Sequence, residues 1–157
     1  MRNYLIQENA CFYHITTGQN WQRIQTEGLR SQTGRIFVSI SGEFPVLISI
    51  AMEQLPEIRD DSVTNLIFLR LPHSLNNFQV TEIIRDPQAP IEWSNPLQFI
   101  IHRDFIPITN IELMLDLSLG RGPVKANILA TLDRTCMQAG GFYNGSTILN
   151  WANNIQL

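Results

Sequence analysis

The sequence predicts an α+β fold around a largely antiparallel or split sheet. About six segments have the short apolar or alternating patterns of strands, and three or four segments have helical spacing, mostly early and late in the chain. A doubly wound parallel sheet requires a helical crossover between its strands, and no such helix is predicted between the later strands. A length of 157 residues suits one domain, so we expect a single domain over residues 1–157.

The first elements are a strand and a helix joined by a tight turn. Residues 10–15 form a short apolar and aromatic run that predicts a buried strand. Residues 20–27 have apolar side chains at helical spacing, with Thr17 as the expected N-cap and Gly28 where a C′ glycine ends a helix.

The middle of the chain alternates between strands and one helix. Residues 35–41 and 65–71 predict strands, and residues 78–84 predict another with polar side chains outward. Residues 45–55 are apolar on most faces and start with Pro45, which favours a buried helix over a strand.

The last third combines a loop, a strand pair and a helix. Three prolines in residues 85–96 predict a structured loop. Residues 97–102 and 108–117 predict two paired strands. Residues 124–139 predict the strongest helix, with Val124, Ile128, Leu132 and Met137 as its apolar stripe, and residues 147–155 allow a short amphipathic helix.

Composition and charge exclude several classes of protein. A net charge of −3 argues against a protein that coats duplex nucleic acid, although a local group of arginines could still hold a short strand. The basic residues are ten Arg and only one Lys, Lys125. No apolar run approaches a membrane span, and Glu8 falls where a signal peptide would be apolar, so we expect a cytoplasmic protein without a membrane partner.

The cysteines and histidines do not have the spacing of a metal site. Cys11 and Cys136 stand alone, and two reduced thiols are favoured over one disulfide. His14, His73 and His102 are scattered, so no metal is expected.

Three short motifs follow one another near the start of the chain. They are Phe12-Tyr13-His14-Ile15-Thr16 in the first strand, Gly28-Leu29 after the first helix, and Gly34-Arg35-Ile36-Phe37-Val38-Ser39 in the second strand. This order resembles the start of the ADP-ribosyltransferase fold. The wording Tyr-His-Ile-Thr, with Asn20 opening the helix, is most similar to the DarT-like toxins, which modify DNA bases.

A later segment carries the resemblance further. Residues 97–102, followed by residues 105–111 with Ile106-Pro107, look like the last core strand of that fold. The resemblance is best over residues 10–56 and 96–115, and the C-terminal helix and tail, residues 118–157, keep an unknown role. It implies an ADP-ribosyltransferase-like split antiparallel or mixed sheet with flanking helices.

The resemblance also implies a site for NAD. His14 takes the place of the family's histidine, which bonds the ribose on the adenosine side, and Thr16 joins it among the NAD-binding residues. Phe37 takes the stacking place under the nicotinamide ring in place of the usual Tyr, and Ser39 would line the pocket.

Gln98 stands where the family has its catalytic Glu. An amide accepts a hydrogen bond but has no charge to stabilise an oxocarbenium-like ribose, a loss of about 2–4 kcal/mol or roughly 10²–10³ in rate. Glu92, in the loop just before this strand, is the expected substitute carboxylate, and Glu112 and Asp104 are weaker candidates.

The leading hypothesis is therefore an NAD-dependent mono-ADP-ribosyltransferase, bacterial and toxin-like. It would act on a single-stranded nucleic acid or a protein, with an antitoxin or another protein as partner. The alternatives are a catalytically degenerate member that binds a nucleotide, nucleic acid or protein, and an unrelated α+β interaction protein. If these residues form no NAD site, His14 and Phe37 are core residues and Gln98 faces solvent.

The loops would select the acceptor, namely residues 85–96 and 30–34. Four arginines either border the same cleft, where their planar forks suit phosphates or bases, or are dispersed solvated charges; they are Arg30, Arg35, Arg85 and Arg103.

Overall fold

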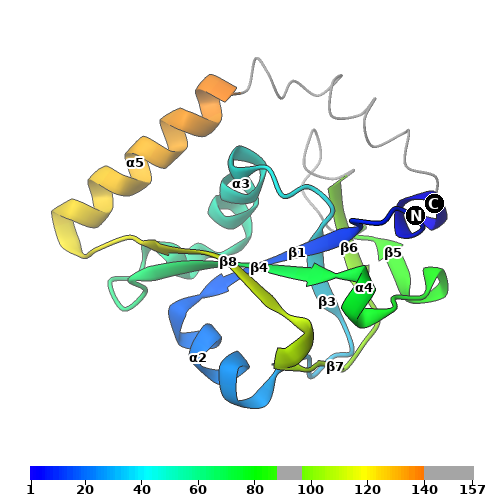
Figure 1. Ribbon diagram of the computed structural model, residues 1–157. Coiled ribbons are helices and arrows are strands. Elements are labelled where there is room, and N and C mark those ends of the chain that lie inside the picture. The colour runs from blue at the N-terminus through cyan, green and yellow to red at the C-terminus, as the bar shows by residue number, and fades with distance from the viewer. Residues whose placement is uncertain (88–96, 140–157) are drawn as a thin grey trace.

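The computed structural model describes residues 1–87 and 97–139, with side chains described to residue 134 (Figure 1). Within these residues, six strands form one antiparallel sheet in the order β5-β6-β3-β1-β4-β8, and β2 pairs with β7 in a second small sheet. The strands are β1 (Cys11–Thr17), β2 (Leu29–Arg30), β3 (Ile36–Ser39), β4 (Asn65–Pro72), β5 (Ile83–Arg85), β6 (Gln98–Ile101), β7 (Phe105–Ile106) and β8 (Glu112–Ser118). The α+β class is confirmed.

Helices cover both faces of the large sheet. They are α1 (Arg2–Leu5), α2 (Gly18–Glu27), α3 (Phe44–Gln54), α4 (His73–Asn76) and α5 (Gly122–Ala139). Figure 1 shows α2 below the sheet and α3 above it. Two apolar cores result, because alternate residues of each strand point to opposite faces: Phe12 and Ile24 belong to one core, and Leu47 and Phe68 belong to the other.

The first predicted strand and helix are confirmed. β1 continues through Thr17, whose side chain accepts a hydrogen bond from Asn20 N at 3.4 Å and so caps α2. Gly28 ends the helix with φ +77°, and a Cβ there would lie 2.4 Å from the Phe105 ring and 2.8 Å from Ile106 O. Glycine is therefore required by both backbone conformation and space.

The predicted helices at 45–55 and 124–139 and the strands at 35–41 and 65–71 are also confirmed, with ends shifted by a few residues. In α5, Ile128 and Leu132 pack into the core that contains α3, as expected. Val124 does not belong to this stripe, because it is 60% exposed in the first turn of the helix. The side chain of Met137 lies outside the described residues.

The predicted strand at 78–84 is wrong over most of its length. A 3₁₀ helix, Val80–Glu82, precedes the three-residue strand β5. The side chain of Glu82 accepts a hydrogen bond from Gln79 N at 2.9 Å, and Gln79 and Glu82 form a reciprocal capping box. Side-chain bonding to the backbone thus replaces strand pairing in this segment.

The predicted pairing of residues 97–102 with residues 108–117 is also wrong. β6 lies between β5 and β3, whereas β8 pairs with β4 at the far edge of the sheet. The chain between them is held by β7, which pairs with β2, and by the 3₁₀ helix Ile108–Asn110. These long-range pairings carry the chain across the molecule and prevent a hairpin.

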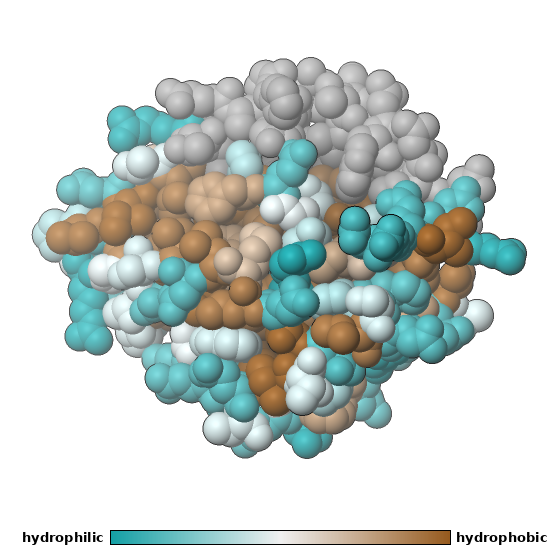
Figure 2. Space-filling model, in the orientation of Figure 1, coloured by the Kyte–Doolittle hydropathy of each residue, from teal (hydrophilic) through white to brown (hydrophobic). Residues whose placement is uncertain are grey.

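The edge strand β8 keeps an apolar surface. Figure 2 shows apolar side chains across the left and middle of the face on which Figure 1 places β8 and the start of α5. Leu113 is exposed and Leu115 half-buried.

No helix within the described ranges is both long and apolar enough to span a membrane. The remainder of the 85–96 loop and the expected helix at 147–155 lie outside the described residues.

Candidate functional site

The large sheet is joined at its middle by one residue pair. β1 pairs with β4 along its whole length, from Cys11 opposite Pro72 to Thr17 opposite Leu66, but it pairs with β3 only where Tyr13 lies opposite Ser39. Next to this pair the ring of His14 spans the two strands, because its Nδ1 lies 2.7 Å from Phe37 O. A single residue pair therefore links the two halves of the sheet.

Two pockets meet at this junction, and His14 and Phe37 line both. The first, here called the inner pocket, has a volume of about 200 Å³ on the α3 side, and its walls include Tyr13, Ser39, Gln54, Asp86 and Gln98. The second, the outer pocket, has a volume of about 530 Å³ on the α2 side, and its walls include Thr16, Asn20, Arg23, Arg30 and Arg35. Residues distant in the sequence thus border one two-part cleft.

His14 has a neutral ring, in which one nitrogen donates a hydrogen bond and the other can accept one. Burial lowers the pKa of its imidazole below the ordinary 6.5, while the bond to Phe37 O acts in the opposite direction. A carbonyl oxygen only accepts, so Nδ1 carries the proton and donates it. In the neutral ring Nε2 then keeps its lone pair, which suits a hydroxyl donor such as a ribose.

Phe37 presents an uncovered aromatic ring to the cleft. Its side chain is 45% exposed, which excludes the bland alternative that it is a core residue. Ile100 lies opposite Phe37 on β6, and Ile84 lies opposite Ile100 on β5, so the ring continues into an apolar row across three strands. Such a surface suits stacking of a planar ring.

Gln98 is buried in the inner pocket rather than facing solvent. It is 3% exposed, and its Oε1 accepts a hydrogen bond from Gln54 Nε2. Its own Nε2 has no hydrogen-bond partner. A buried amide donor without a partner typically costs about 1–3 kcal/mol, so this group is available to a ligand in the pocket.

Ser39 and Thr16 are both buried and occupy different parts of the cleft. Ser39 lines the inner pocket, but its hydroxyl donates to Ser41 O at 3.0 Å and accepts from Ser41 N at 3.1 Å. Its polar atom therefore shapes the turn after β3. Thr16 lines the outer pocket.

The carboxylate in the inner pocket is one that sequence reasoning missed. Glu92 lies outside the described residues. Glu112 pairs with Arg70 at 3.5 Å on the edge of the sheet, and neither it nor Asp104 lines the inner or the outer pocket. Asp86 does line the inner pocket and is 4% exposed. Its sequence signal was alternation, because continuing the strand beyond Ile84 places Asp86 on the same face.

The arginines divide between the cleft and the scaffold. Arg30 and Arg35 line the outer pocket, together with Arg23, which sequence reasoning also missed. Arg85 lies over the Phe99 ring at 5.9 Å and lines neither pocket. Within the described ranges, no ion pair joins Arg23, Arg30 or Arg35 to a carboxylate.

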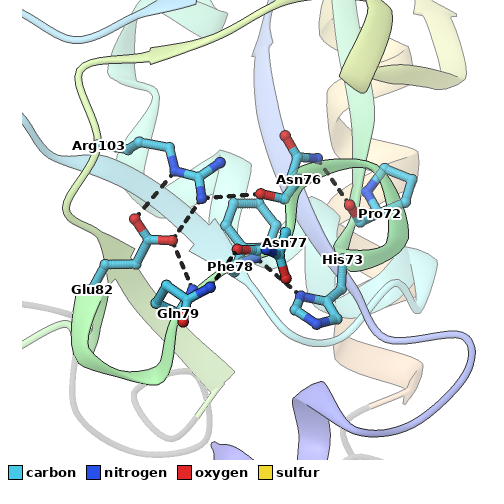
Figure 3. Close-up of polar contacts among 8 residues, drawn as sticks. All are labelled: Pro72, His73, Asn76, Asn77, Phe78, Gln79, Glu82 and Arg103. Atoms are coloured by element: carbon cyan, nitrogen blue, oxygen red, sulfur yellow. Dashed lines mark hydrogen bonds and ion pairs between the residues drawn. The ribbon is translucent and has the colours of Figure 1, made fainter.

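Arg103 belongs to a structural cluster away from the cleft (Figure 3). Its guanidinium donates to both carboxylate oxygens of Glu82, at 2.7 and 3.2 Å, and to Asn76 O at 3.1 Å. It also lies over the Phe78 ring at 4.6 Å. These bonds use its planar fork to fix the turn around η2 (Val80–Glu82).

The thiol of Cys11 is free and buried, and burial raises its pKa. The side chain of Cys136 lies outside the described residues. Among the residues that the structure describes, no group of three or more His, Cys, Asp or Glu side chains could hold a metal ion.

Comparison of the chain with models of protein families, with curated proteins and with solved structures finds no match.

Proposed function

We propose that this protein is an NAD-dependent mono-ADP-ribosyltransferase with the fold of that family. The observation that carries the proposal is the convergence of His14, Phe37, Ser39 and Gln98 on one pocket, although they come from three strands. The sequence resemblance alone assigned these residues to a common site, so their meeting at the split of the sheet supports it independently.

The two pockets have the character that the two halves of NAD require. The exposed Phe37 ring offers a stacking face, and Nε2 of His14 accepts from a ribose hydroxyl. The guanidinium groups of Arg23, Arg30 and Arg35 border the outer pocket, where they suit a diphosphate. Glu27, the carboxylate in that pocket, only partly offsets their charge.

The acceptor and partners belong to the same proposal. The arginines of the outer pocket favour an acceptor that carries phosphates, which makes a base in a single-stranded nucleic acid the first candidate and a protein the second. A toxin acting on such a target in the cytoplasm would be controlled by an antitoxin or another protein partner.

A second function is favoured by one observation, the neutral Gln98 amide in the place of a catalytic Glu. A member of the fold without the charge would bind a nucleotide without cleaving it. Gln98→Glu discriminates between the two functions. If the wild-type chain binds NAD without cleaving it and Gln98→Glu cleaves it much faster, the site is intact and lacks only the charge.

The test is incubation of the protein with NAD, alone and with single-stranded DNA or RNA oligonucleotides. Nicotinamide release is measured by chromatography and NAD binding by thermal shift. We expect release by the wild-type chain and at least a tenfold loss in His14→Ala. His102→Ala is the matched control, because His102 is exposed and lines neither pocket. If the wild-type chain shows no turnover and no NAD-induced thermal shift, the proposal is contradicted.

A further inference from the structure

The register of β3, β6 and β5 places a carboxylate beside Gln98. Ser39 lies opposite Gln98 on β6, and the backbone N–H of Asp86 donates to Gln98 O at 3.0 Å just beyond the end of β5. Phe37, Ile100 and Ile84 form a row two positions away along the same three strands. Side chains of a strand alternate between the faces of the sheet, so residues two positions apart share one face. Ser39, Gln98 and Asp86 therefore form one cross-strand row, with Asp86 next to Gln98.

This row forms part of the inner pocket and is shielded from water. Asp86 and Gln98 are 4% and 3% exposed, and both line the pocket whose other wall is α3. Neighbouring side chains on one face of an antiparallel pair have Cβ atoms about 4.5–5.5 Å apart. A carboxylate at that spacing is within reach of the ligand group that Gln98 would contact.

We propose that Asp86 is the catalytic carboxylate of this chain, and that Gln98 holds the ligand by hydrogen bonds while Asp86 supplies the negative charge. The inference rests on the proposed function, since it assigns a residue to its reaction. Compared with a Glu at the position of Gln98 on β6, the carboxylate lies one strand away, just beyond the end of β5. Asp86 and Gln98 both line the inner pocket. A buried charge acts more strongly than a solvated one on a cation that develops beside it.

The step balances without any further reactant besides water or the acceptor. The bond between C1′ of the nicotinamide ribose and the ring nitrogen breaks, and its electron pair leaves with the pyridinium, which becomes neutral nicotinamide. The ribose carbon gains positive charge, which the Asp86 carboxylate stabilises. The acceptor nucleophile, or water, then bonds to C1′ and loses its proton to solvent.

The experiment compares Asp86→Asn, Asp86→Glu and the wild-type chain by two separate measurements. NAD affinity is measured by calorimetry, and nicotinamide release is measured at saturating NAD. We expect Asp86→Asn to lower the rate of release by roughly 10²–10³-fold with NAD affinity little changed, and Asp86→Glu to retain most of the rate. Asp104→Asn is the matched control, because Asp104 is exposed and lines neither pocket.

A second variant keeps the test decisive if Asp86→Asn is unstable. The double variant Asp86→Asn with Gln98→Glu moves the charge to β6 and should recover release at least tenfold over Asp86→Asn. If Asp86→Asn does not fold, Asp86→Ser and its double variant with Gln98→Glu give the same comparison. If folded Asp86→Asn releases nicotinamide at the wild-type rate, the role of Asp86 is overturned and the proposed function still stands. NAD binding without cleavage by the wild-type chain overturns the catalytic role and supports the binding function instead, and absence of both contradicts the proposed function itself.

Discussion

At the scale of single residues, His14 couples folding to pH. Burial lowers its pKa in the folded chain below the 6.5 of the unfolded chain, so between these two values the unfolded chain binds more protons. The free energy of unfolding therefore falls as the pH decreases through and below 6.5, and this contribution is fully present only above that pH.

We predict that acidification from about pH 7.5 to about pH 5.5 lowers the stability of the wild-type chain more than that of His14→Gln, which keeps an amide donor for Phe37 O but does not titrate. Urea midpoints at the two pH values measure the difference. His102→Gln, at an exposed position, should keep the wild-type pH dependence. Equal pH dependence in wild type and His14→Gln would show that His14 is not the group responsible.

The residue scale is also where local sequence is least informative about the site. Gln98 could be assigned to a strand from its apolar neighbours, but nothing in the sequence distinguished a solvent-facing amide from one that is buried against Gln54. The three prolines of residues 85–96 predict a loop, and Asp86 falls within it. Its backbone N–H donates to Gln98 O and so holds it beside β6, a contact that only the folded sheet creates.

At the scale of elements, Lys125 anchors α5 to the loop before β4. This single lysine is 3% exposed, and its Nζ donates to Asp60 O and, at 2.6 Å, to Val63 O. The charged donor satisfies the carbonyl of the buried Val63 and adds a second bond to Asp60 O, which also accepts from Val63 N at 3.0 Å. The lone Lys in the composition is therefore a structural residue.

We predict that Lys125→Met destabilises the chain by about 1.5–3 kcal/mol, because methionine keeps the apolar stem and removes the donor. Urea denaturation followed by circular dichroism measures the change. Val124→Ala is the control, since Val124 is exposed and should change stability by no more than about 0.5 kcal/mol. A Lys125→Met protein as stable as the control would contradict the anchoring role.

Elements with strong local signals could be predicted, and elements defined by distant partners could not. Pro45 at the start of α3 and the Thr17 cap of α2 are local features that mark a helix wherever it packs. The short strands β2 and β7 exist only because Leu29 lies opposite Ile106 and Arg30 opposite Phe105. Residues 78–84 have a strand-like pattern, but the bonds that Glu82 makes to Gln79 N and Arg103 replace most of the strand.

At the scale of the whole molecule, the single-pair junction between β1 and β3 divides the sheet into two units. β1, β4 and β8 are joined by long ladders, and β3, β6 and β5 form the other unit. Few backbone hydrogen bonds link the two units, so we expect the second unit to open without global unfolding.

We predict that native-state hydrogen exchange reports a lower opening free energy for amides of β6 than for amides of β4. NAD at saturating concentration should slow exchange in β3 and β6, because the cleft lies at the junction. Exchange measured by mass spectrometry in increasing denaturant tests both statements. One common free energy for β4 and β6 would contradict the two-unit description.

The sequence by itself determined the α+β class, the main helices and strands, and a short set of residues that resemble an NAD site. These follow from local periodicity, caps and motifs, which act over a few neighbouring residues. Only the tertiary structure decided the strand order, the single-pair junction beside His14, the structural role of Arg103 and the presence of Asp86 in the pocket. The physical reason is that register and burial depend on contacts between segments far apart in the chain, as for Asp86, which lines the pocket with Gln98 because its backbone N–H bonds Gln98 O.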